Sequence, residues 1–364
     1  LIASTALLSS SISIIDSAGF CATICSQLMN YRNTIELFVK ILNKKITGRV
    51  DQNMTKKFKH KFRPPSLLER IRKNQRESLS LLTATMLLVR SPNTVDLASA
   101  LPRKADRIDM RYQWISRFLS NTHINVEEIM HPYAIEIFKR LAQGGGTLIL
   151  MIDQSKVASG HEVLMVSVRL RDRAVPVMWK VVKTSGEIGY KEQKELLKKV
   201  QSFIPSGAKV VLMGDRFYGT SDLIFYCQEL KWDYRLRLKG NLLVESEEIG
   251  ETTTGELGRS RIKFVENVFL TKRKVKTNIG FARESGHPET WIIAMASKPS
   301  FYKTMDYGMR FGIEGLFSDL KSRGFSIEDS QLKHAERLER LLLVMALALY
   351  WAVSTGLWDE KHNP

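Results

Sequence analysis

The chain has 364 residues, of which 44% are hydrophobic and 26% charged, and these proportions exclude a wholly disordered protein. Its 55 Lys and Arg outnumber its 38 Asp and Glu, which leaves a formal net charge of +17. This excess favours a polyanionic partner, either nucleic acid or an anionic membrane surface. The three cysteines, Cys21, Cys25 and Cys227, are too few for a disulfide framework and lack zinc-site spacing, so a reducing compartment is expected.

Residues 1–53 are predicted to be an uncertain leader, with Met29 and Met54 as alternative starts of the native product. The beginning of this segment is broken by Ser and Thr and lacks the basic start of a signal peptide. The most apolar stretch of the chain, Leu341 to Val353, is shorter than the roughly 18 residues that a membrane-spanning helix needs. A buried helix is therefore predicted there, and no membrane partner is expected.

The region 54–146 is predicted to be a helical N-terminal DNA-binding region. Cations are dense from Met54 to Arg76, and they fit either a solvated basic arm or contacts with DNA phosphates. Further along, Ser91 to Thr94 predicts a helix break with a new N-cap. The segments from Thr94 to Pro102 and from Arg111 to Asn121 then predict two short helices around a turn, which is typical of a helix-turn-helix unit. A plain helical bundle fits the same pattern.

The glycines Gly144 to Gly146 mark the clearest boundary, because strand-like patterns follow them in the region 147–240. Two apolar, strand-length runs of this region lead into Asp153 and Asp215. The order of elements is three meandering strands, then helix, strand, helix and strand. This order predicts an α/β fold with a ribonuclease H-like catalytic core, in which the first and fourth strands lie side by side and bring the two carboxylates together.

Residues 241–290 fit that sheet less well, and they are predicted to be a β-rich insertion with a basic rim. Residues 291–358 are predicted to be the second part of the core, with a Glu-bearing helix and a C-terminal helix. Several cations in these regions fit either contacts with DNA or solvated edges of strands and hairpins. They are Arg237 and Lys239, near the strand that follows Asp215, and Lys272, Arg273 and Lys274 in the insertion.

Four polar residues recur at spacings of three, four and seven, which puts them on one face of a predicted helix. They are Tyr307, Arg310, Glu314 and Lys321. A solvated charged face is an adequate explanation for any one of them. Together with the two Asp at strand ends, however, Glu314 supplies a third hard oxygen donor. Mg²⁺ prefers such carboxylates along with water and substrate phosphates, so the sequence predicts a site for phosphoryl transfer.

Three blocks of the sequence fit one known pattern. The residues from Tyr307 to Lys321 contain Tyr-x2-Arg-x3-Glu-x6-Lys with all four fixed positions present. The other two blocks are Ile152-Asp153-Gln154-Ser155 and Gly214-Asp215-Arg216-Phe217-Tyr218-Gly219. With these blocks the chain resembles the bacterial insertion-sequence DDE transposases, specifically the IS-four (Tn-five-like) family. The resemblance covers most of the chain after the Gly boundary, whereas the helical front end is similar only in general character.

This resemblance implies a catalytic, metal-binding triad and three contacts with the phosphates next to the cut. The triad is Asp153, Asp215 and Glu314, and the phosphate contacts are Tyr307, Arg310 and Lys321. The implied cofactor is Mg²⁺, as two ions, with Mn²⁺ able to substitute. Arg suits bidentate phosphate binding, Lys a point charge, and the Tyr hydroxyl a single hydrogen bond.

The resemblance also implies the reaction and the partners. The reaction is cut-and-paste transposition, in which hydrolysis at the element's ends frees 3′-hydroxyls that attack target DNA. The partners are double-stranded DNA, as terminal inverted repeats and target, and a second copy of the chain in a homodimer on DNA. The expected location is the bacterial cytoplasm, in association with the nucleoid. Two alternatives stay open: a catalytically inactive or domesticated DNA-binding descendant, and a ribonuclease H-like nuclease without strand transfer.

Overall fold

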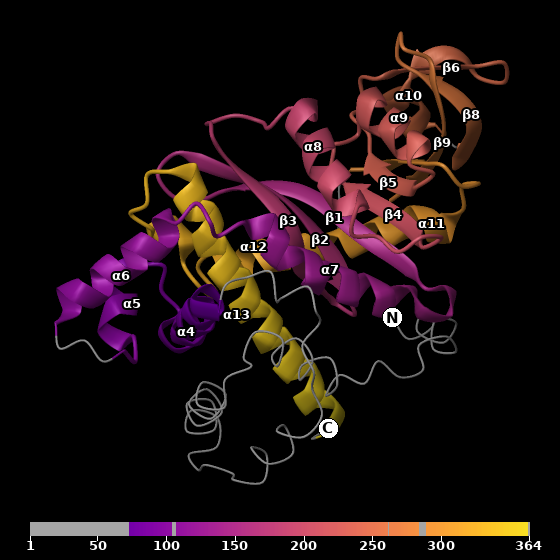
Figure 1. The fold of residues 1–364 in the computed structure, drawn as a ribbon. Helices are drawn as coiled ribbons and strands as arrows, with labels where there is room; N and C mark the ends of the chain where they lie inside the picture. Colours follow the sequence, from indigo (N-terminus) through magenta and orange to yellow (C-terminus); the bar gives the residue numbers. More distant parts are fainter. Residues whose placement is uncertain (1–72, 104–106, 261, 284–288, 363–364) are drawn as a thin grey trace. The chain divides into compact units, whose positions relative to one another are not determined.

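The computed structural model describes residues 73–103, 107–260, 262–283 and 289–362 (Figure 1). The predicted leader and most of the basic arm lie outside these residues. The described chain divides into two compact units. The helical unit comprises the described residues up to Arg140, Lys156–Glu162 and the residues from Ser318 onward, and the sheet unit comprises Leu141–Ser155 and Val163–Phe317. The end of the chain thus groups with the N-terminal helices, while the predicted domain boundaries stay predictions.

Most of the described helical unit is α-helical. Its elements are α4 (Lys73–Val89), α5 (Thr94–Ala100), α6 (Ile108–Ser120), α7 (Val126–Ala142), the short 3-10 helix η4 (Ile327–Asp329) and α13 (Ala335–His362). The predicted break before α5 is confirmed, because the Asn93 side chain accepts a hydrogen bond from the Val95 N–H and caps the new helix. α5 and α6 pack against each other as the predicted pair of short helices. Their role in reading DNA stays a prediction.

The long helix α13 packs against α4 and α6. Its Arg340 is 9% exposed and donates hydrogen bonds to the carbonyls of Leu119 (3.0 Å) and Ile124 (3.2 Å) at and just beyond the end of α6. By length and a mean hydropathy of 1.7, Ala335–Leu357 meets the criterion for a membrane span, but 67% of that segment is buried inside the protein. The core helix of a soluble protein meets the same criterion. Within the predicted buried run, the residues from Leu341 to Tyr350 are all buried, whereas Trp351 to Val353 are partly or fully exposed.

The sheet unit is built on a ten-stranded sheet with the order β3-β2-β1-β4-β5-β10-β9-β8-β6-β7. It follows the predicted Gly boundary, which forms the 3-10 helix η2 (Gln143–Gly145). Its first five strands are β1 (Thr147–Lys156), β2 (His161–Leu170), β3 (Arg173–Lys183), β4 (Lys209–Gly214) and β5 (Asp233–Arg237). β1 pairs in parallel with β4, and β4 pairs in parallel with β5. The predicted pairing of the first and fourth strands is therefore confirmed, in a mixed α/β architecture.

The predicted β-rich insertion forms strands, but these strands extend the same sheet, so the expectation of a poor fit to the sheet is wrong. They are β6 (Leu243–Ser246), β7 (Gly250–Thr253), β8 (Phe264–Leu270) and β9 (Val275–Ala282), with α10 (Thr254–Arg259) between β7 and β8. The next strand, β10 (Trp291–Met295), lies in the region predicted to be the second part of the core. β10 lies between β5 and β9 and pairs antiparallel with both. The reason is that the edge of β5 has unpaired backbone groups, which β10 satisfies.

Helices cover both faces of the sheet. On one face α8 (Tyr190–Gln201) packs against β3 and α9 (Ser221–Glu229) against β5 (Figure 1). On the other face α11 (Phe301–Met305) packs against β9 and the 3-10 helix η3 (Asp306–Arg310) against β4 and β5, and α12 (Phe311–Leu320) follows. Neighbouring side chains of β5 mark the two faces, because they alternate along a strand. The Tyr234 hydroxyl accepts a hydrogen bond from Gln228 of α9 (3.1 Å), whereas Arg235 donates to the Lys303 carbonyl of α11 (2.9 Å).

Candidate active site

Two carboxylates lie on neighbouring strands in the sheet unit, Asp153 within β1 and Asp215 directly after β4. The parallel pairing of β1 with β4 sets Met151 opposite Met213, and the same register two residues further on brings Asp153 level with Asp215. Asp153 accepts a hydrogen bond from the N–H of Gln154 at 2.8 Å, which orients its carboxyl group. The register of two buried strands therefore brings together two residues that lie far apart in the sequence.

The turn that carries Asp215 is shaped by two close approaches of the backbone. Gly214 ends β4, and a Cβ at this position would lie 2.7 Å from the Cβ of Tyr218. At Gly219, a Cβ would lie 2.0 Å from the carbonyl oxygen of Arg237 in β5. Only glycine fits at both positions without a shift of the neighbouring chain. The Gly-Asp-x-x-x-Gly pattern is thus a steric requirement for holding the carboxylate at the end of β4.

A third carboxylate, Glu314, lies in the first turn of α12 and shares a cation with Asp153. Arg310, the last residue of η3, donates from Nη1 to Asp153 Oδ2 at 3.0 Å and from Nη2 to Glu314 Oε1. The Arg310 side chain is 8% exposed, compared with 16% for Asp153 and 52% for Glu314. The guanidinium is therefore buried between two of the three predicted catalytic carboxylates, and Glu314 is the partner on the solvent side.

The charges of these carboxylates act on one another. Burial is the largest influence on Asp153 and raises its pKa from 3.8 to about 6. The Arg310 cation opposes this rise in the pKa, whereas the negative charges of Asp215 and Glu314 add to it. The three side chains are therefore close enough for their charges to interact. Their mutual repulsion is unfavourable, and the Arg310 cation reduces it.

The three carboxylates are the type of ligand that a hard divalent cation prefers, because Mg²⁺ binds carboxylate oxygens together with water and phosphates. Within the part of the chain that the structure describes, however, no three acidic, His or Cys side chains are arranged to hold an ion. Arg310 provides a physical reason, since its two terminal nitrogens already bind one oxygen of Asp153 and one of Glu314. These donors fit the metal only if the guanidinium withdraws.

The predicted helical face is interrupted, because the 3-10 helix η3 precedes α12 and Lys321 lies beyond the last residue of α12. Tyr307 is 1% exposed, and its ring packs against Trp291 and Phe311 with centroid separations of 5.1 and 6.4 Å. The guanidinium carbon of Arg310 lies 5.8 Å from the centroid of the Tyr307 ring. Tyr307 therefore supports Arg310 from the core, and a contact of its hydroxyl with a phosphate stays a prediction.

The other predicted DNA contacts lie in both units. Lys321, in the helical unit, forms an ion pair with Glu328 at 3.0 Å. In the sheet unit, Arg237 is 18% exposed at its side chain and pairs with Glu289 at 2.9 Å, while Lys239 is exposed. A contact with DNA stays a prediction for all three cations.

The basic rim of the predicted insertion forms the turn between β8 and β9. Arg273 pairs with Asp222 of α9, and Lys274 pairs with Glu245 of β6 at 2.6 Å. Lys272 is exposed. Two of these cations therefore tie the turn to its neighbours, and for all three the role in binding DNA stays a prediction.

One residue that organises the site was missed by the sequence reasoning. Arg169 on β2 donates from Nη1 to the carbonyl of Met309 at 3.2 Å, and it pairs with Asp172 at 3.2 Å. Because Met309 directly precedes Arg310, this bond fixes the backbone that presents the guanidinium. The two partners are 140 residues apart, so no local pattern indicates their contact.

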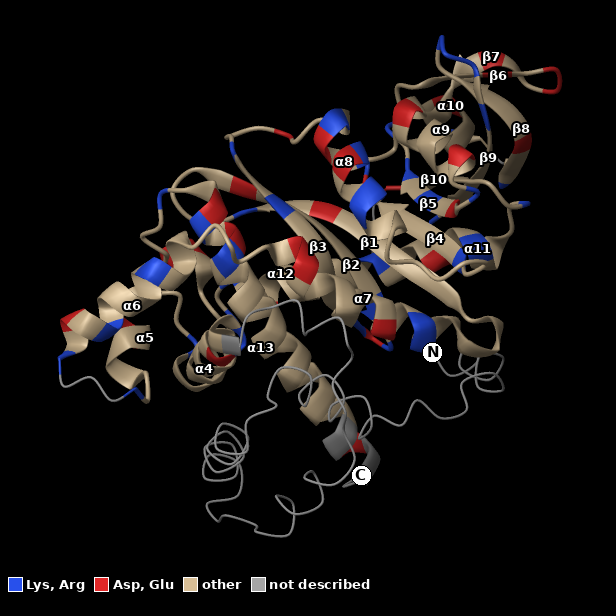
Figure 2. Cartoon of the chain, in the orientation of Figure 1, with Lys and Arg blue, Asp and Glu red and all other residues tan. Residues whose placement is uncertain are grey.

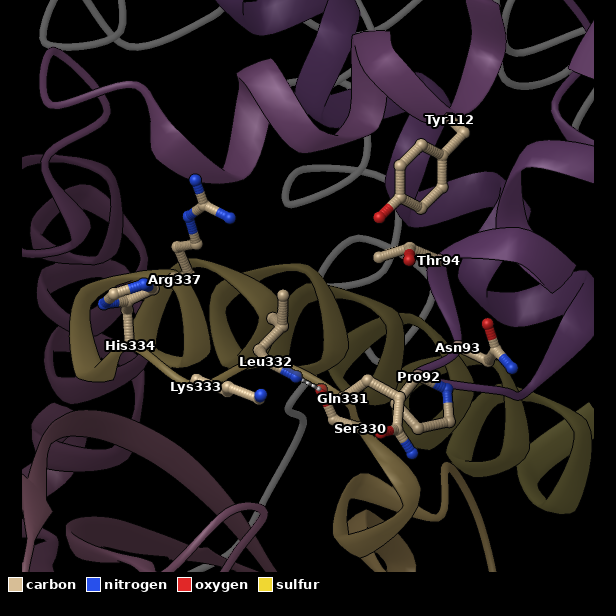
Figure 3. A pocket seen from close by; sticks show the side chains of 10 residues that line it. All are labelled: Pro92, Asn93, Thr94, Tyr112, Ser330, Gln331, Leu332, Lys333, His334 and Arg337. Atoms are coloured by element: carbon tan, nitrogen blue, oxygen red, sulfur yellow. Dashed lines mark hydrogen bonds between the residues drawn. The ribbon is translucent and has the colours of Figure 1, made fainter. Parts of the chain in front are cut away.

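The helical unit has a separate basic pocket, the α13 pocket, of about 200 Å³ (Figure 3). Lys333 and His334, directly before α13, and Arg337 in its first turn line this pocket, and the side chains of Thr94 and Tyr112 line it from α5 and α6 (Figure 3). The described residues that line it include no Asp or Glu. This combination of cations and hydroxyl groups is suited to a phosphate group.

The fold and the site together define an α/β protein with a candidate active site of three electrostatically coupled carboxylates and a buried arginine. Residues 187–351 match the family model described as the transposase DDE domain. The matched range contains Asp215, Arg310 and Glu314, and it begins after Asp153. The match supports a DDE transposase. No curated protein matches the chain.

Proposed function

We propose that this chain is a DNA transposase that moves an insertion sequence by a cut-and-paste reaction. The observation that carries the proposal is the coupling of Asp153, Asp215 and Glu314 in a chain whose residues 187–351 match a transposase DDE domain. The strand order β3-β2-β1-β4-β5 supports a ribonuclease H-like core. The resemblance of the Tyr-Arg-Glu-Lys signature supports membership of the IS-four (Tn-five-like) family.

The proposed chemistry is metal-dependent phosphoryl transfer in which DNA forms no covalent bond with the protein. Asp153, Asp215 and Glu314 would hold two Mg²⁺ ions, or Mn²⁺ in their place, which when bound help to activate the attacking oxygen and stabilise the leaving one. Water attacks at the ends of the element, and the freed 3′-hydroxyls then attack target DNA. Arg310 offers a planar pair of donors to a phosphate next to the cut.

The proposed partner is double-stranded DNA at the terminal repeats and at the target. The net charge of +17, with Lys and Arg on both units (Figure 2), supports a polyanionic partner. The proposed contacts in and near the catalytic core are Tyr307, Arg310, Lys321, Arg237, Lys239, Lys272, Arg273 and Lys274. In the helical unit, the α13 pocket is suited to a backbone phosphate. Two ends must be held at once, so we expect a homodimer on DNA, acting in the bacterial cytoplasm.

A cleavage assay tests this proposal. A labelled duplex that carries the element's terminal repeat is incubated with the protein, with Mg²⁺ in one arm and EDTA in the other. We expect a metal-dependent cut at the repeat boundary that is lost in Asp153→Asn, Asp215→Asn and Glu314→Gln. Each of these variants should still bind the duplex, because the substitutions are nearly isosteric.

Glu195→Gln serves as the matched control, because Glu195 is an exposed carboxylate of α8 that pairs with Lys180, and the control should cut normally. If any of the three active-site variants cut as well as this control, the assignment of that carboxylate would be wrong.

Two alternatives are separated by further arms of the same assay. A nuclease without strand transfer would cut the ends, but it would fail to join pre-cut ends to a target plasmid. An inactive DNA-binding descendant would bind the repeat and cut with neither Mg²⁺ nor Mn²⁺. Affinity alone does not distinguish them, because a basic protein binds DNA with strong salt dependence in every case.

A further inference from the structure

Arg310 occupies the place where a metal ion would meet Asp153 and Glu314. Its Nη1 binds an oxygen of Asp153 at 3.0 Å, its Nη2 binds an oxygen of Glu314, and its side chain is only 8% exposed. The remaining nitrogen, Nε, is buried and has no hydrogen-bond partner within the described part of the chain. The two carboxylates are thus the anions that hold the guanidinium, and Tyr307 supports it from the core side.

A buried guanidinium that leaves its carboxylates needs another anion, because an unpaired buried charge is strongly unfavourable. A metal ion that binds these carboxylates would displace the guanidinium and leave it without a partner. Arg310 and a divalent cation therefore compete for the same oxygen atoms. In the absence of another ligand, the competition weakens the binding of the metal.

A phosphate group is suited to take the place of the carboxylates. The planar fork of Arg binds phosphate as it binds carboxylate, through two parallel hydrogen bonds. Glu314 is 52% exposed, so a ligand from solvent can reach the guanidinium from that side. The rings of Tyr307 and Phe311 lie 5.8 and 5.4 Å from the guanidinium carbon, and they restrict how far it can move. A short displacement toward a phosphate remains within reach of the side chain.

We propose that Arg310 blocks the carboxylate site until a DNA phosphate draws its guanidinium away, so that DNA and metal bind cooperatively. The inference rests on the proposed function, because it takes DNA as the source of the phosphate. Binding linkage is reciprocal, so DNA should raise the affinity for metal by the same factor by which metal raises the affinity for DNA. The site would then become loaded with metal mainly when a substrate strand is present.

The test measures the affinity for Mn²⁺ by electron paramagnetic resonance, with and without a short duplex of arbitrary sequence, after subtraction of the Mn²⁺ bound by the duplex alone. For the wild type, we expect the duplex to tighten Mn²⁺ binding about tenfold. Arg310→Gln should bind Mn²⁺ about tenfold more tightly than the wild type without DNA, and it should gain little from the duplex. Arg310→Lys keeps the positive charge but loses the fork, so its affinity without DNA should stay near that of the wild type.

Lys180→Gln is the matched control, since it removes one cation on β3 that pairs with Glu195 and not with the carboxylates of the site. It should keep the wild-type gain in Mn²⁺ affinity on addition of DNA. If Arg310→Gln fails to fold, as judged by thermal unfolding in EDTA, Arg310→Lys decides the question. We then expect the duplex to raise the Mn²⁺ affinity of Arg310→Lys much less than that of the wild type.

The inference is overturned if Arg310→Gln folds but binds Mn²⁺ no more tightly than the wild type, or if the wild type gains no Mn²⁺ affinity from the duplex. It is also overturned if Arg310→Lys keeps the full gain. No cleavage is needed for these measurements. A protein that shows the linkage but fails to cut or join DNA would contradict the proposed function alone.

Discussion

Replacement of Asp153 by Asn should stabilise the metal-free protein at neutral and alkaline pH. Burial, with Arg310 in opposition, raises the pKa of the Asp153 carboxyl group from 3.8 to about 6. The folded state therefore holds this proton more tightly than the unfolded chain does, so stability falls as the pH rises through this range. The Asn side chain does not ionise, and the cost of the buried charge is absent from the variant.

The magnitude follows from the size of the pKa difference. One pKa unit corresponds to about 1.4 kcal/mol, so a rise from 3.8 to about 6 makes the ionised carboxylate cost about 3 kcal/mol. The cost is about 0.5 kcal/mol at about pH 4 and reaches nearly its full value above about pH 7. The opposing attraction of Arg310 is already contained in this pKa, so the gain expected for Asp153→Asn at about pH 8 is about 3 kcal/mol.

The assay is urea unfolding of the wild type and the variant in EDTA, at about pH 4 and about pH 8. Asp233→Asn is the control of opposite sign. Burial favours its neutral form, but the Arg235 cation together with hydrogen bonds from Arg235, Ser297 and Tyr234 outweighs burial and holds the pKa of Asp233 below its usual value. The stability of this variant should therefore fall further below that of the wild type as the pH rises. A stability difference between Asp153→Asn and the wild type that is the same at both pH values would refute the reasoning.

Three further predictions concern the packing and the pocket. Trp291→Ala should lower the free energy of unfolding by about 3–5 kcal/mol in urea titrations, because the ring is 1% exposed and packs beneath η3. Gly214→Ala should cost about 1–3 kcal/mol in the same titrations, since its Cβ would lie 2.7 Å from a side-chain carbon, and wild-type stability would contradict the steric argument. Lys333→Gln combined with Arg337→Gln should reduce the slope of log affinity for duplex DNA against log salt by about 2, as measured by fluorescence anisotropy. An unchanged slope would exclude the α13 pocket as a phosphate contact, and a variant lacking two exposed lysines of α8 controls for net charge.

Much of the site could be located from the sequence, because its signals are local. An apolar run followed by a carboxylate predicts a buried strand that ends in a polar group. Asp215 follows this pattern directly after β4, whereas β1 continues past Asp153 to Lys156. The order of strands and helices then predicted that these two strands are neighbours, and their parallel register confirms it. The spacing of the signature predicted Glu314 on a helix, and it lies in the first turn of α12.

Other features were predicted wrongly or not at all from the sequence, because they depend on which strand edges and helix faces meet in the folded chain. The strands after residue 241 were expected to fit the core sheet poorly, but β10 pairs with the edge of β5 and joins them to it. The spacing of Tyr307 indicated a polar helical face, whereas its ring is buried against Trp291 in an aromatic cluster. A periodic pattern shows that a face exists, but it contains no information about the surface that covers that face.

The sequence by itself indicated which carboxylates lie together, since hydrophobic runs and signature spacing are properties of neighbouring residues. Only the tertiary structure decided which cation pairs with these carboxylates and what holds that cation in place. Arg310 pairs with Asp153, which is 157 residues away, and Arg169 holds the adjacent backbone from β2. Such pairs arise because burial in a low-dielectric interior forces each charge to find a partner, and the partner is chosen by the folded geometry and not by the order of the chain.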